Sequence, residues 1–219
     1  MIVFLTGGSR GIGKHIKKVF LNKGWEVISP TSSELDLGDV ESVIKYTSKA
    51  NFVPDVIINN AGTNTVENVI DFSRDTFMRM MDINFISHVM LTKEFLKKSK
   101  CNNKRLSVIN IGSIRIQEMK KGRIHYTISK ACLDIFTKYL IHEMGDERLR
   151  CNTISPGYVA TDMLTRNNDQ DKLKDMMNSV PLERFCNPIE IAEAAFHIAV
   201  ENTYLNGQNI VIDGGKSCR

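Results

Sequence analysis

The chain has 219 residues, of which 42% are hydrophobic and 25% charged, values that fit one domain with a substantial core. The formal net charge of +4 is a weak basic bias, and the sequence contains no recognisable nucleic-acid-binding module, which argues against nucleic acid as a partner. No apolar run approaches the length of a membrane span, and the first predicted strand follows Met1 directly, so we expect a cytoplasmic protein.

The five cysteines lie far apart, at positions 101, 132, 151, 186 and 218. Their number is odd and no pair has the close spacing of zinc ligands, so we expect neither a disulfide framework nor a metal site. Buried structural thiols are the ordinary interpretation of such cysteines.

Strand-like and helix-like segments alternate along the chain. In chain order we expect a strand at residues 2–5, a helix at 11–22, strands at 26–29 and 35–37, a helix at 40–48, a strand at 56–59, a helix at 74–98, a strand at 107–111, a helix at 125–144, a strand at 150–154, a helix at 188–200 and a strand at 209–212. The helix at 125–144 carries Ile128, Cys132, Ile135 and Tyr139 on one face. The polar residues 165–178 lie outside this alternation and form a candidate mobile insert.

The alternation predicts a parallel sheet with helices on both faces, because parallel strands need crossover connections. Right-handed crossovers make such a sheet doubly wound. The sequence contains no repeat, low-complexity tract or linker. We therefore expect a single α/β domain over residues 1–219.

The first strand joins the first helix through a glycine-rich turn, TGGSRGIG at residues 6–13. Glycine permits a tight turn and the close approach of a phosphate, while the helix N-terminus offers N–H groups and the positive end of a dipole. The glycine order differs from the commoner GxGxxG loop. Dinucleotide binding and simple packing are both consistent with this turn alone.

Further motifs, together with this turn, resemble those of the classical short-chain dehydrogenase/reductase family over nearly the whole chain. They are TGxxxGxG from Thr6 to Gly13, NNAG at 59–62, Asn84, Ser113, the YxxxK pair of Tyr126 and Lys130, PGxxxT from Pro156 to Thr161, and DGG at 213–215. The resemblance implies a Rossmann-like sheet of about seven strands in the order 3-2-1-4-5-6-7. The chain departs from the family between its second and fourth strands, where PTSSELDLGD replaces a longer segment and one helix is lost.

Tyr126 and Lys130 are four residues apart, so on a helix they lie on one face. A free tyrosine has a pKa of about 10, and a neighbouring ammonium is expected to lower it towards the working pH of a general acid or base. Tyr126 would then exchange a proton with the oxygen of a carbonyl or an alcohol. An ordinary amphipathic helix is the other interpretation of the pair taken in isolation.

Ser113 follows a predicted strand, and the carboxyl ends of parallel strands face the ligand cleft. Its hydroxyl would orient the substrate oxygen, although a helix-capping serine is the ordinary alternative. The resemblance implies that Asn84 holds a water linking Lys130 to solvent. It therefore assigns catalytic roles to Asn84, Ser113, Tyr126 and Lys130.

The expected coenzyme is NADP(H), with NAD(H) as the alternative. NAD specificity normally needs an acidic residue after the second strand, where this chain has Ser29, Pro30 and Thr31, and Arg10 could pair with a 2′-phosphate. Glu34 could instead reach back to a ribose. The expected coenzyme-binding residues are Gly7, Ser9, Arg10, Ile12, Gly13, Ser29, Thr31, Asp36, Leu37, Asn60, Ala61, Gly62, Ile111, Tyr126, Lys130, Pro156, Gly157, Val159 and Thr161.

Substrate choice is expected to lie in residues 114–124 and in a mobile lid at about 158–181. The candidate substrate contacts are Ser113, Arg115, Tyr126, Gly157, Tyr158 and Met163. Residues 114–124 include Arg115, Lys120, Lys121 and Arg123. An anionic or carrier-linked substrate would suit this charge, whereas solvated loop residues are the ordinary interpretation.

These features predict an NADP(H)-dependent oxidoreductase that transfers a hydride between nicotinamide and a carbonyl or secondary alcohol, resembling 3-oxoacyl-carrier-protein reductases or sugar, polyol and ketone reductases. A nucleotide-binding regulator without turnover is the main alternative, and an epimerase or dehydratase is a third. The resemblance also implies a homodimer or homotetramer that associates through the helices at 74–98 and 125–144.

Overall fold

A single parallel sheet forms the centre of the molecule in the computed structural model, which describes residues 1–165 and 168–218. Its strands are β1 (Ile2–Leu5), β2 (Glu26–Ile28), β3 (Val56–Asn59), β4 (Leu106–Ile111), β5 (Leu149–Pro156) and β6 (Asn209–Ile212). Over the described residues the order is β2-β1-β3-β4-β5-β6, with every neighbouring pair parallel. The predicted doubly wound α/β fold is confirmed.

The strand predicted at residues 35–37 does not form, so the sheet has six described strands and β2 at its edge. The backbone groups of this segment are used in turns: Leu35 N–H donates to Thr31 O, and Asp36 N–H donates to the Ser42 hydroxyl. The remaining order is the expected one without its edge strand. The predicted shortening between β2 and β3 is therefore present, and it removes a strand as well as a helix.

The described helices are α1 (Gly11–Asn22), α2 (Val40–Lys49), α3 (Arg74–Met81), α4 (Ser87–Cys101), α5 (Ile124–Met144), α6 (Asp162–Thr165), α7 (Gln170–Asn178) and α8 (Pro188–Phe196). The long helix predicted at 74–98 is interrupted by a π-helical turn, η1 (Asp82–Ile86), which holds Asn84. A second π-helical turn, η3 (His197–Glu201), follows α8. Such turns often mark functional positions in a helix.

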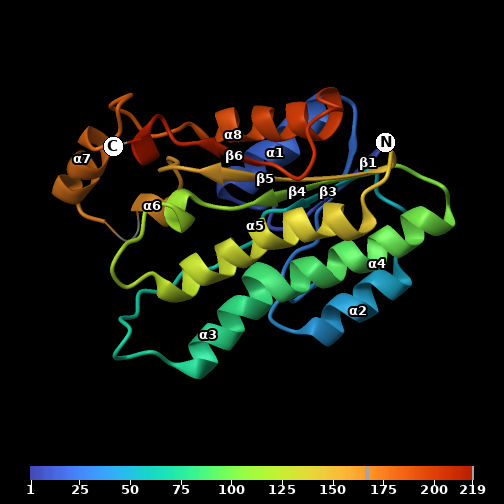
Figure 1. Ribbon diagram of the computed structural model, residues 1–219, viewed down its shortest axis with the longest axis horizontal. Coiled ribbons are helices and arrows are strands. Elements are labelled where there is room, and N and C mark those ends of the chain that lie inside the picture. Colours follow the sequence, from blue (N-terminus) through green and yellow to red (C-terminus); the bar gives the residue numbers. More distant parts are fainter. Residues whose placement is uncertain (166–167, 219) are drawn as a thin grey trace.

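The helices cover both faces of the sheet, α1 and α8 on one and α2, α4 and α5 on the other (Figure 1). Side chains alternate between the faces of a strand, and β1 shows this directly. Val3 and Leu5 pack with the α1 and α8 core, whereas Phe4 packs with Phe95 of α4, with ring centroids 4.9 Å apart. The two cores hold the sheet from both sides.

A buried polar network crosses the α4 and α5 side of the sheet. Asn59 Nδ2 donates to Asn110 Oδ1 at 2.8 Å, and Asn110 Nδ2 donates to the Thr137 hydroxyl at 2.8 Å. The Thr137 and Thr153 hydroxyls are 2.8 Å apart, so the network joins β3, β4, α5 and β5. Buried polar groups need such partners, and here their bonds fix the strands just before the residues of the site.

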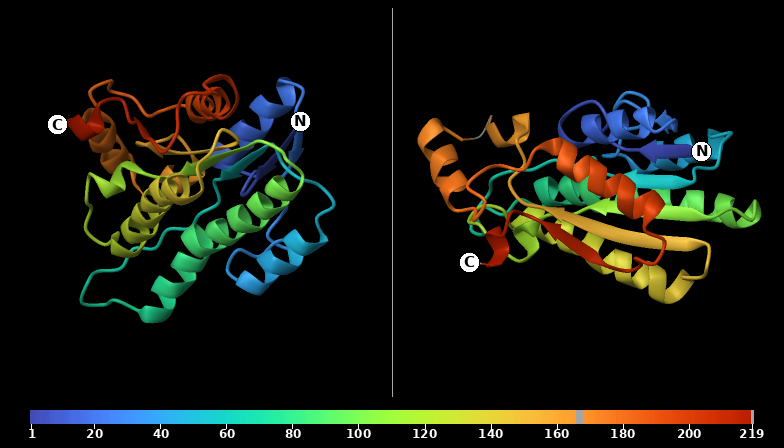
Figure 2. Two further views of the ribbon diagram at one scale, coloured as in Figure 1. Left: turned by 45° about the vertical axis from the view of Figure 1, so that its right-hand side comes forward. Right: turned by 90° about the horizontal axis from the view of Figure 1, so that it is seen from above.

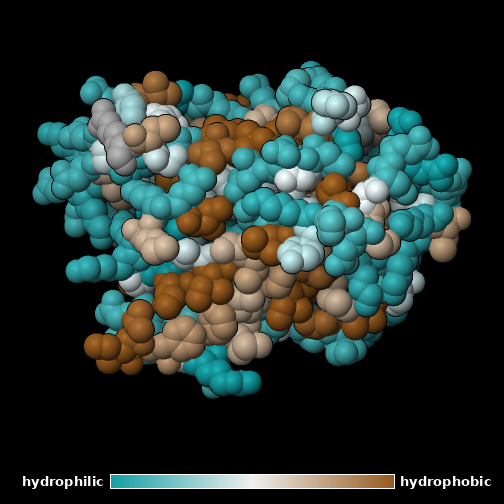
Figure 3. Space-filling model, in the orientation of Figure 1, coloured by the Kyte–Doolittle hydropathy of each residue, from teal (hydrophilic) through white to brown (hydrophobic). Residues whose placement is uncertain are grey.

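The apolar face predicted on α5 lies on the outside of the chain. Ile135 is 51% exposed and Tyr139 is 59% exposed, whereas Leu133 and Thr137 point into the molecule. Hydrophobic residues gather over α3, α4 and α5 in Figure 3. This face is unpartnered in the single chain.

The cysteines are free, and the structure corrects the expectation that they are buried. Cys151 is buried, but Cys101 and Cys218 are exposed. Within residues 1–165 and 168–218, no helix is both long and apolar enough to cross a bilayer.

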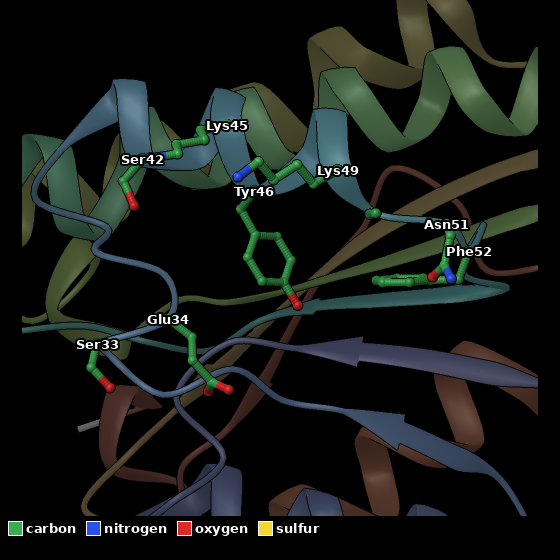
Figure 4. Close-up of a pocket in the computed structure, with 9 residues that line it drawn as sticks. Ser33, Glu34, Ser42, Lys45, Tyr46, Lys49, Asn51 and Phe52 are labelled. Atoms are coloured by element: carbon green, nitrogen blue, oxygen red, sulfur yellow. The ribbon is translucent and has the colours of Figure 1, made fainter.

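All six strands point towards the end of the molecule that carries α6 and α7 (Figures 1 and 2). The segment predicted as a mobile insert is helical over α6 and α7, while residues 166 and 167 lie outside the described residues. A hollow of about 520 Å³ lies between α2 and the residues after β2, where the shortened segment leaves space (Figure 4). Tyr46 points into this hollow from α2, and none of the predicted catalytic residues lines it.

Candidate active site

A cavity of about 1040 Å³ lies at the carboxyl ends of the strands. Every residue predicted to bind coenzyme or substrate lines it, from Gly7 in the first turn to Thr161 before α6. Of the four predicted catalytic residues, Ser113, Tyr126 and Lys130 line the cavity and Asn84 is buried behind it. Segments from both halves of the chain therefore meet at one site, as the fold rule for parallel sheets predicts.

The glycine-rich turn forms a cradle that side chains would fill. A Cβ at Gly13 would overlap the carbonyl oxygen of Gly7 and lie 2.5 Å from Asn60 Nδ2, and a Cβ at Gly7 would lie 2.9 Å from Ala61 Cα. Gly7 has a φ of +69°, which favours glycine. The contacts press the N-terminus of α1 against the loop after β3.

The first turn of α1 has no side-chain cap and no acidic residue of its own, so its N–H groups and the positive end of its dipole are available to an anion. Thr6 holds the facing loop, because its hydroxyl accepts bonds from the N–H groups of Asn60 and Ala61, both at 3.0 Å. Together the glycine cradle and this helix end fit the pyrophosphate of a dinucleotide coenzyme.

The adenosine end of the cavity contains cations that the sequence analysis missed. Lys17 and Arg79 line the cavity as Arg10 does, Lys17 from the second turn of α1 and Arg79 from α3. A Cβ on Gly38 would lie 3.8 Å from Arg79 Nη1, which places Arg79 next to the loop that carries Asp36. No short motif marks either residue, because the fold brings them from separate helices.

Glu34, the residue predicted as a possible ribose ligand, is bound elsewhere. Its Oε2 accepts bonds from the Thr31 N–H at 2.7 Å and the Thr31 hydroxyl at 2.8 Å. These bonds lower the pKa of its carboxyl group. Glu34 does not line the large cavity but the hollow beside α2.

Tyr126 and Lys130 lie on one face of α5, with Lys130 Nζ 5.9 Å from the centre of the tyrosine ring. Lys130 is 3% exposed, and its ammonium donates to the Ile111 carbonyl oxygen at 2.7 Å. Burial lowers the pKa of Lys130 to about 8, because a buried ammonium loses its hydration. The end of β4 thus anchors the amine beside the phenol.

The pKa of Tyr126 is raised, contrary to the predicted lowering. Burial is the main cause, and it outweighs the hydrogen bond with Ser113 and the charges of Arg115 and Arg123, which act in the opposite direction. Desolvation disfavours a phenolate more strongly than these partners favour it. Without coenzyme the site therefore holds a neutral phenol, ready to donate a proton.

Ser113 caps a short helix, which is the ordinary alternative named for it, and it lies next to Tyr126. Its hydroxyl accepts a bond from the Arg115 N–H at 3.2 Å, which caps a short 3-10 helix, η2 (Ile114–Ile116), and it also bonds Tyr126. The cap fixes the side chain at the end of β4. Ser113 thus lies where it can share a substrate oxygen with Tyr126.

Asn84 is held behind the cavity by its side-chain amide. Its Oδ1 accepts from the Thr63 N–H at 2.8 Å, and its Nδ2 donates to the Thr63 carbonyl and the Ser129 hydroxyl, both at 3.0 Å. A Cβ on Gly62 would lie 3.3 Å from Asn84 Oδ1 and 3.6 Å from Lys130 Nζ. The asparagine and the lysine therefore both lie beside Gly62, where a side chain would crowd Asn84.

His88 is a buried residue near this group that the sequence analysis did not single out. Its Nδ1 lies 3.2 Å from the Asn84 carbonyl oxygen, and its Nε2 lies 3.3 Å from the Thr6 hydroxyl. Burial, helped by the charge of Lys130, lowers the pKa of His88 to about 3. The imidazole is therefore neutral and adds no second positive charge beside the amine.

The substrate side of the cavity is built from the basic loop after β4 and the segment after β5. The Arg115 guanidinium lies 5.2 Å from the centre of the Tyr158 ring, and Met163 lies on α6. A Cβ on Gly157 would lie 2.7 Å from Asp213 Cα, so the glycine lets the segment after β5 approach the DGG turn closely. The predicted substrate contacts therefore share one wall.

Comparison with known proteins agrees with this arrangement. A family model described as enoyl-(acyl carrier protein) reductase matches residues 30–217. The 3-oxoacyl-[acyl-carrier-protein] reductase FabG of Rickettsia conorii is 30% identical, over 96% of this chain and 94% of the relative. Glucose 1-dehydrogenase 2 of Bacillus subtilis is 27% identical, over 96% of this chain and 92% of the relative.

Among solved structures, one described as a 4-hydroxyisoleucine dehydrogenase mutant complexed with NADH and succinate superposes with a TM-score of 0.92 and 26% identity. The match covers 100% of this chain and 99% of the other. The shared fold, the family match and the convergence of the motifs at one cavity lead to one assignment. The chain belongs to the short-chain dehydrogenase/reductase family and is an oxidoreductase of the CH–OH group.

Proposed function

We propose that the protein is an NADP(H)-dependent reductase or dehydrogenase in which Tyr126 is the general acid and base. The observation that carries this proposal is that Tyr126, Ser113 and Lys130 line the same cavity as the glycine-rich turn. A coenzyme held on that turn and a substrate oxygen near Tyr126 would then share one enclosed space. The coenzyme, when bound, supplies or accepts the hydride.

The chain's own residues would manage the proton. In reduction Tyr126 donates its proton to the developing alkoxide, while the Ser113 hydroxyl orients the same oxygen. Lys130 would hold the coenzyme ribose and stabilise the phenolate that forms when the proton leaves. We assign Asn84 to a water relay that returns a proton to Lys130, since both side chains lie beside Gly62.

The charges at the adenosine end support NADP(H) over NAD(H). Arg10, Lys17 and Arg79 line the cavity, Arg79 lies beside Gly38 in the loop that carries Asp36, and the carboxylate of Glu34 is bound to Thr31 instead. A 2′-phosphate would be attracted to the three cations, whereas a free ribose would lack its usual carboxylate partner. The NADH-bound structural neighbour keeps NAD(H) as the alternative.

The substrate lid would be the segment at 158–181, which continues through α6 and α7. Gly214 and Gly215 seat its far end, since Cβ atoms there would lie 2.8 Å from Val180 Cγ1 and 3.0 Å from Pro181 Cγ. Such a lid suits a carbonyl or alcohol substrate of the kinds that the relatives' names indicate, an acyl-carrier thioester or a sugar.

Self-association through α3, α4 and α5 is the arrangement that best explains the exposed apolar face. A monomer would leave Ile128, Ile135 and Tyr139 in water, whereas a second copy would bury them. We propose a homodimer or a homotetramer built on this face.

Replacing Tyr126 by Phe removes the proton donor and keeps the aromatic ring. We expect turnover to fall by a factor of about 10² to 10⁴ while the dissociation constant of the coenzyme stays close to that of the wild type. Steady-state kinetics with a screened substrate and fluorescence titration with NADPH measure the two effects. Tyr204→Phe, at a fully exposed position, is the matched control.

Retained turnover in Tyr126→Phe would show that another group transfers the proton. A wild-type protein that binds coenzyme but turns over no carbonyl or alcohol would support the nucleotide-binding regulator instead.

Arg10→Gln removes the cation in the glycine-rich turn. We expect it to weaken NADPH binding by about tenfold or more, because a charge-assisted bond to the 2′-phosphate is lost. NADH binding should change little, and Lys14→Gln, one turn away and exposed, should change neither. Tighter binding of NADH than of NADPH by the wild type would contradict the coenzyme assignment.

Lys130 should make stability depend on pH. Its folded pKa of about 8 lies below the ordinary value of 10.5, so between these pH values the folded protein binds fewer protons than the unfolded protein. The free energy of unfolding of the wild type, relative to Lys130→Met, should therefore rise from pH 8 to pH 10.5. Urea unfolding of both proteins at several pH values measures this difference in free energy. A difference that does not change with pH would contradict the lowered pKa and would show that the lysine is hydrated.

Ile135→Glu places a charge in the centre of the exposed α5 face. We expect this variant to be monomeric under conditions in which the wild type is a dimer or tetramer, because a desolvated carboxylate is costly. Light scattering coupled to size exclusion measures the mass. Tyr204→Glu is the control on a separate exposed site, and a monomeric wild type would contradict the proposal.

A further inference from the structure

The loop between Ser113 and Tyr126 concentrates positive charge beside the proton donor. It carries Arg115, Lys120, Lys121 and Arg123. The fold separates these four, because Arg115, Lys120 and Arg123 line the large cavity whereas Lys121 is exposed and does not. Three of the four cations therefore face the cavity and one faces solvent.

Arg115 already has a counter-charge. Its Nη1 donates to Glu118 Oε2 at 2.7 Å, and the other carboxylate oxygen of Glu118 lies 2.9 Å from Lys216 Nζ. One carboxylate is therefore shared by two cations. Arg115 is held in place by this pair and by the ring of Tyr158, so it serves as part of the wall.

Lys120 and Arg123 have no such partner in the part of the chain that the structure describes. Neither belongs to any of its ion pairs, although both side chains are half-buried. Burial and the charges of Arg115, Lys172 and Arg123 lower the pKa of Lys120, and Glu118 offsets this only weakly. Two partly desolvated cations without a counter-charge are unfavourable, and an anion placed between them would relieve that cost.

Arg123 lies at the start of the helix that carries the proton donor. Arg123 is the residue before α5 and lies three positions from Tyr126, and its charge affects the pKa of the phenol. The first turn of α5 has no acidic residue and no side-chain cap of its own, but the Glu67 carboxylate lies 3.2 Å from His125 Nδ1 in this turn and therefore offsets part of the helix dipole. An anion bound here would lie close to Tyr126.

We propose that Lys120 and Arg123 form an oxyanion-binding subsite, and that the natural substrate carries a carboxylate or a phosphate near its carbonyl or hydroxyl carbon. This inference rests on the proposed function and names its substrate class. The guanidinium suits a bidentate contact with either oxyanion, and the ammonium supplies a compact second charge. Because Arg123 precedes the helix that carries Tyr126 and its charge acts on the phenol, an acid group close to the reacting carbon fits better than a long uncharged chain.

Binding without turnover tests the subsite directly. Malonate and inorganic phosphate are titrated by calorimetry into protein saturated with oxidised coenzyme, so that the glycine-rich turn and Arg10 are occupied. We expect at least one of the two anions to bind and neutral malonamide not to bind. Lys120→Gln and Arg123→Gln should each weaken the affinity for the anion by about tenfold. Lys121→Gln is the matched control and should bind as the wild type does.

The anion that binds more tightly indicates the substrate class. Tighter binding of malonate indicates a carboxylate substrate, and tighter binding of phosphate indicates a phosphorylated substrate. Malonamide binding equal to malonate binding would overturn the inference, and so would equal anion affinities in Arg123→Gln and Lys121→Gln. The comparison of malonate with malonamide uses the wild type, so it decides the question even where a variant misfolds.

Kinetics separate this inference from the proposed function. Acetoacetate and its methyl ester share one ketone and differ in charge, and we expect the wild type to prefer the acid in kcat/KM by about tenfold. That preference should fall in Lys120→Gln and Arg123→Gln and persist in Lys121→Gln. Turnover that ignores the charge would contradict the subsite alone, whereas anion binding without turnover of any ketone or alcohol would contradict the proposed function alone.

Discussion

The hydrogen bond from the buried ammonium of Lys130 to the carbonyl oxygen of Ile111 is the interaction around which the site is arranged. This hydrogen bond ties the second turn of α5 to the end of β4, and it therefore fixes Tyr126 relative to Ser113. The ammonium has no carboxylate among its partners in the described chain. Its surroundings fit this charge, since the neighbouring His88 is neutral and Gly62 leaves room for Asn84 to approach.

A second constraint is steric and acts on the coenzyme side. Only glycine at position 13 allows α1 to begin directly against Gly7 and Asn60, and Thr6 holds the same loop through two backbone N–H groups. The polar network from Asn59 through Asn110 to Thr137 then links that loop to β4 and α5. The coenzyme cradle and the proton-transfer residues are therefore parts of one connected structure.

Most of the fold was predictable because local patterns agree with the tertiary structure: strands such as 56–59 begin with an apolar run and are fully buried, and capping residues mark the helix starts. The strand at 35–37 was wrong because turn bonds took its backbone groups. Three features of the site could not be predicted from residue spacing. The pKa of Tyr126 is raised by burial, and the Glu34 carboxylate is held by Thr31. Lys17 and Arg79 reach the cavity from separate helices that only the tertiary fold brings together.

The proposed mechanism requires Tyr126, a partly buried residue, to be a neutral proton donor that shares its cavity with the nicotinamide end of the coenzyme. Titration of the tyrosine ζ-carbon by NMR, assigned with the Tyr126→Phe variant, measures its pKa directly. The account predicts a value above the ordinary 10.0 in the free protein and a fall on binding of the positively charged oxidised coenzyme. A pKa at or below the ordinary value in the free protein, or one that the coenzyme does not change, would contradict it.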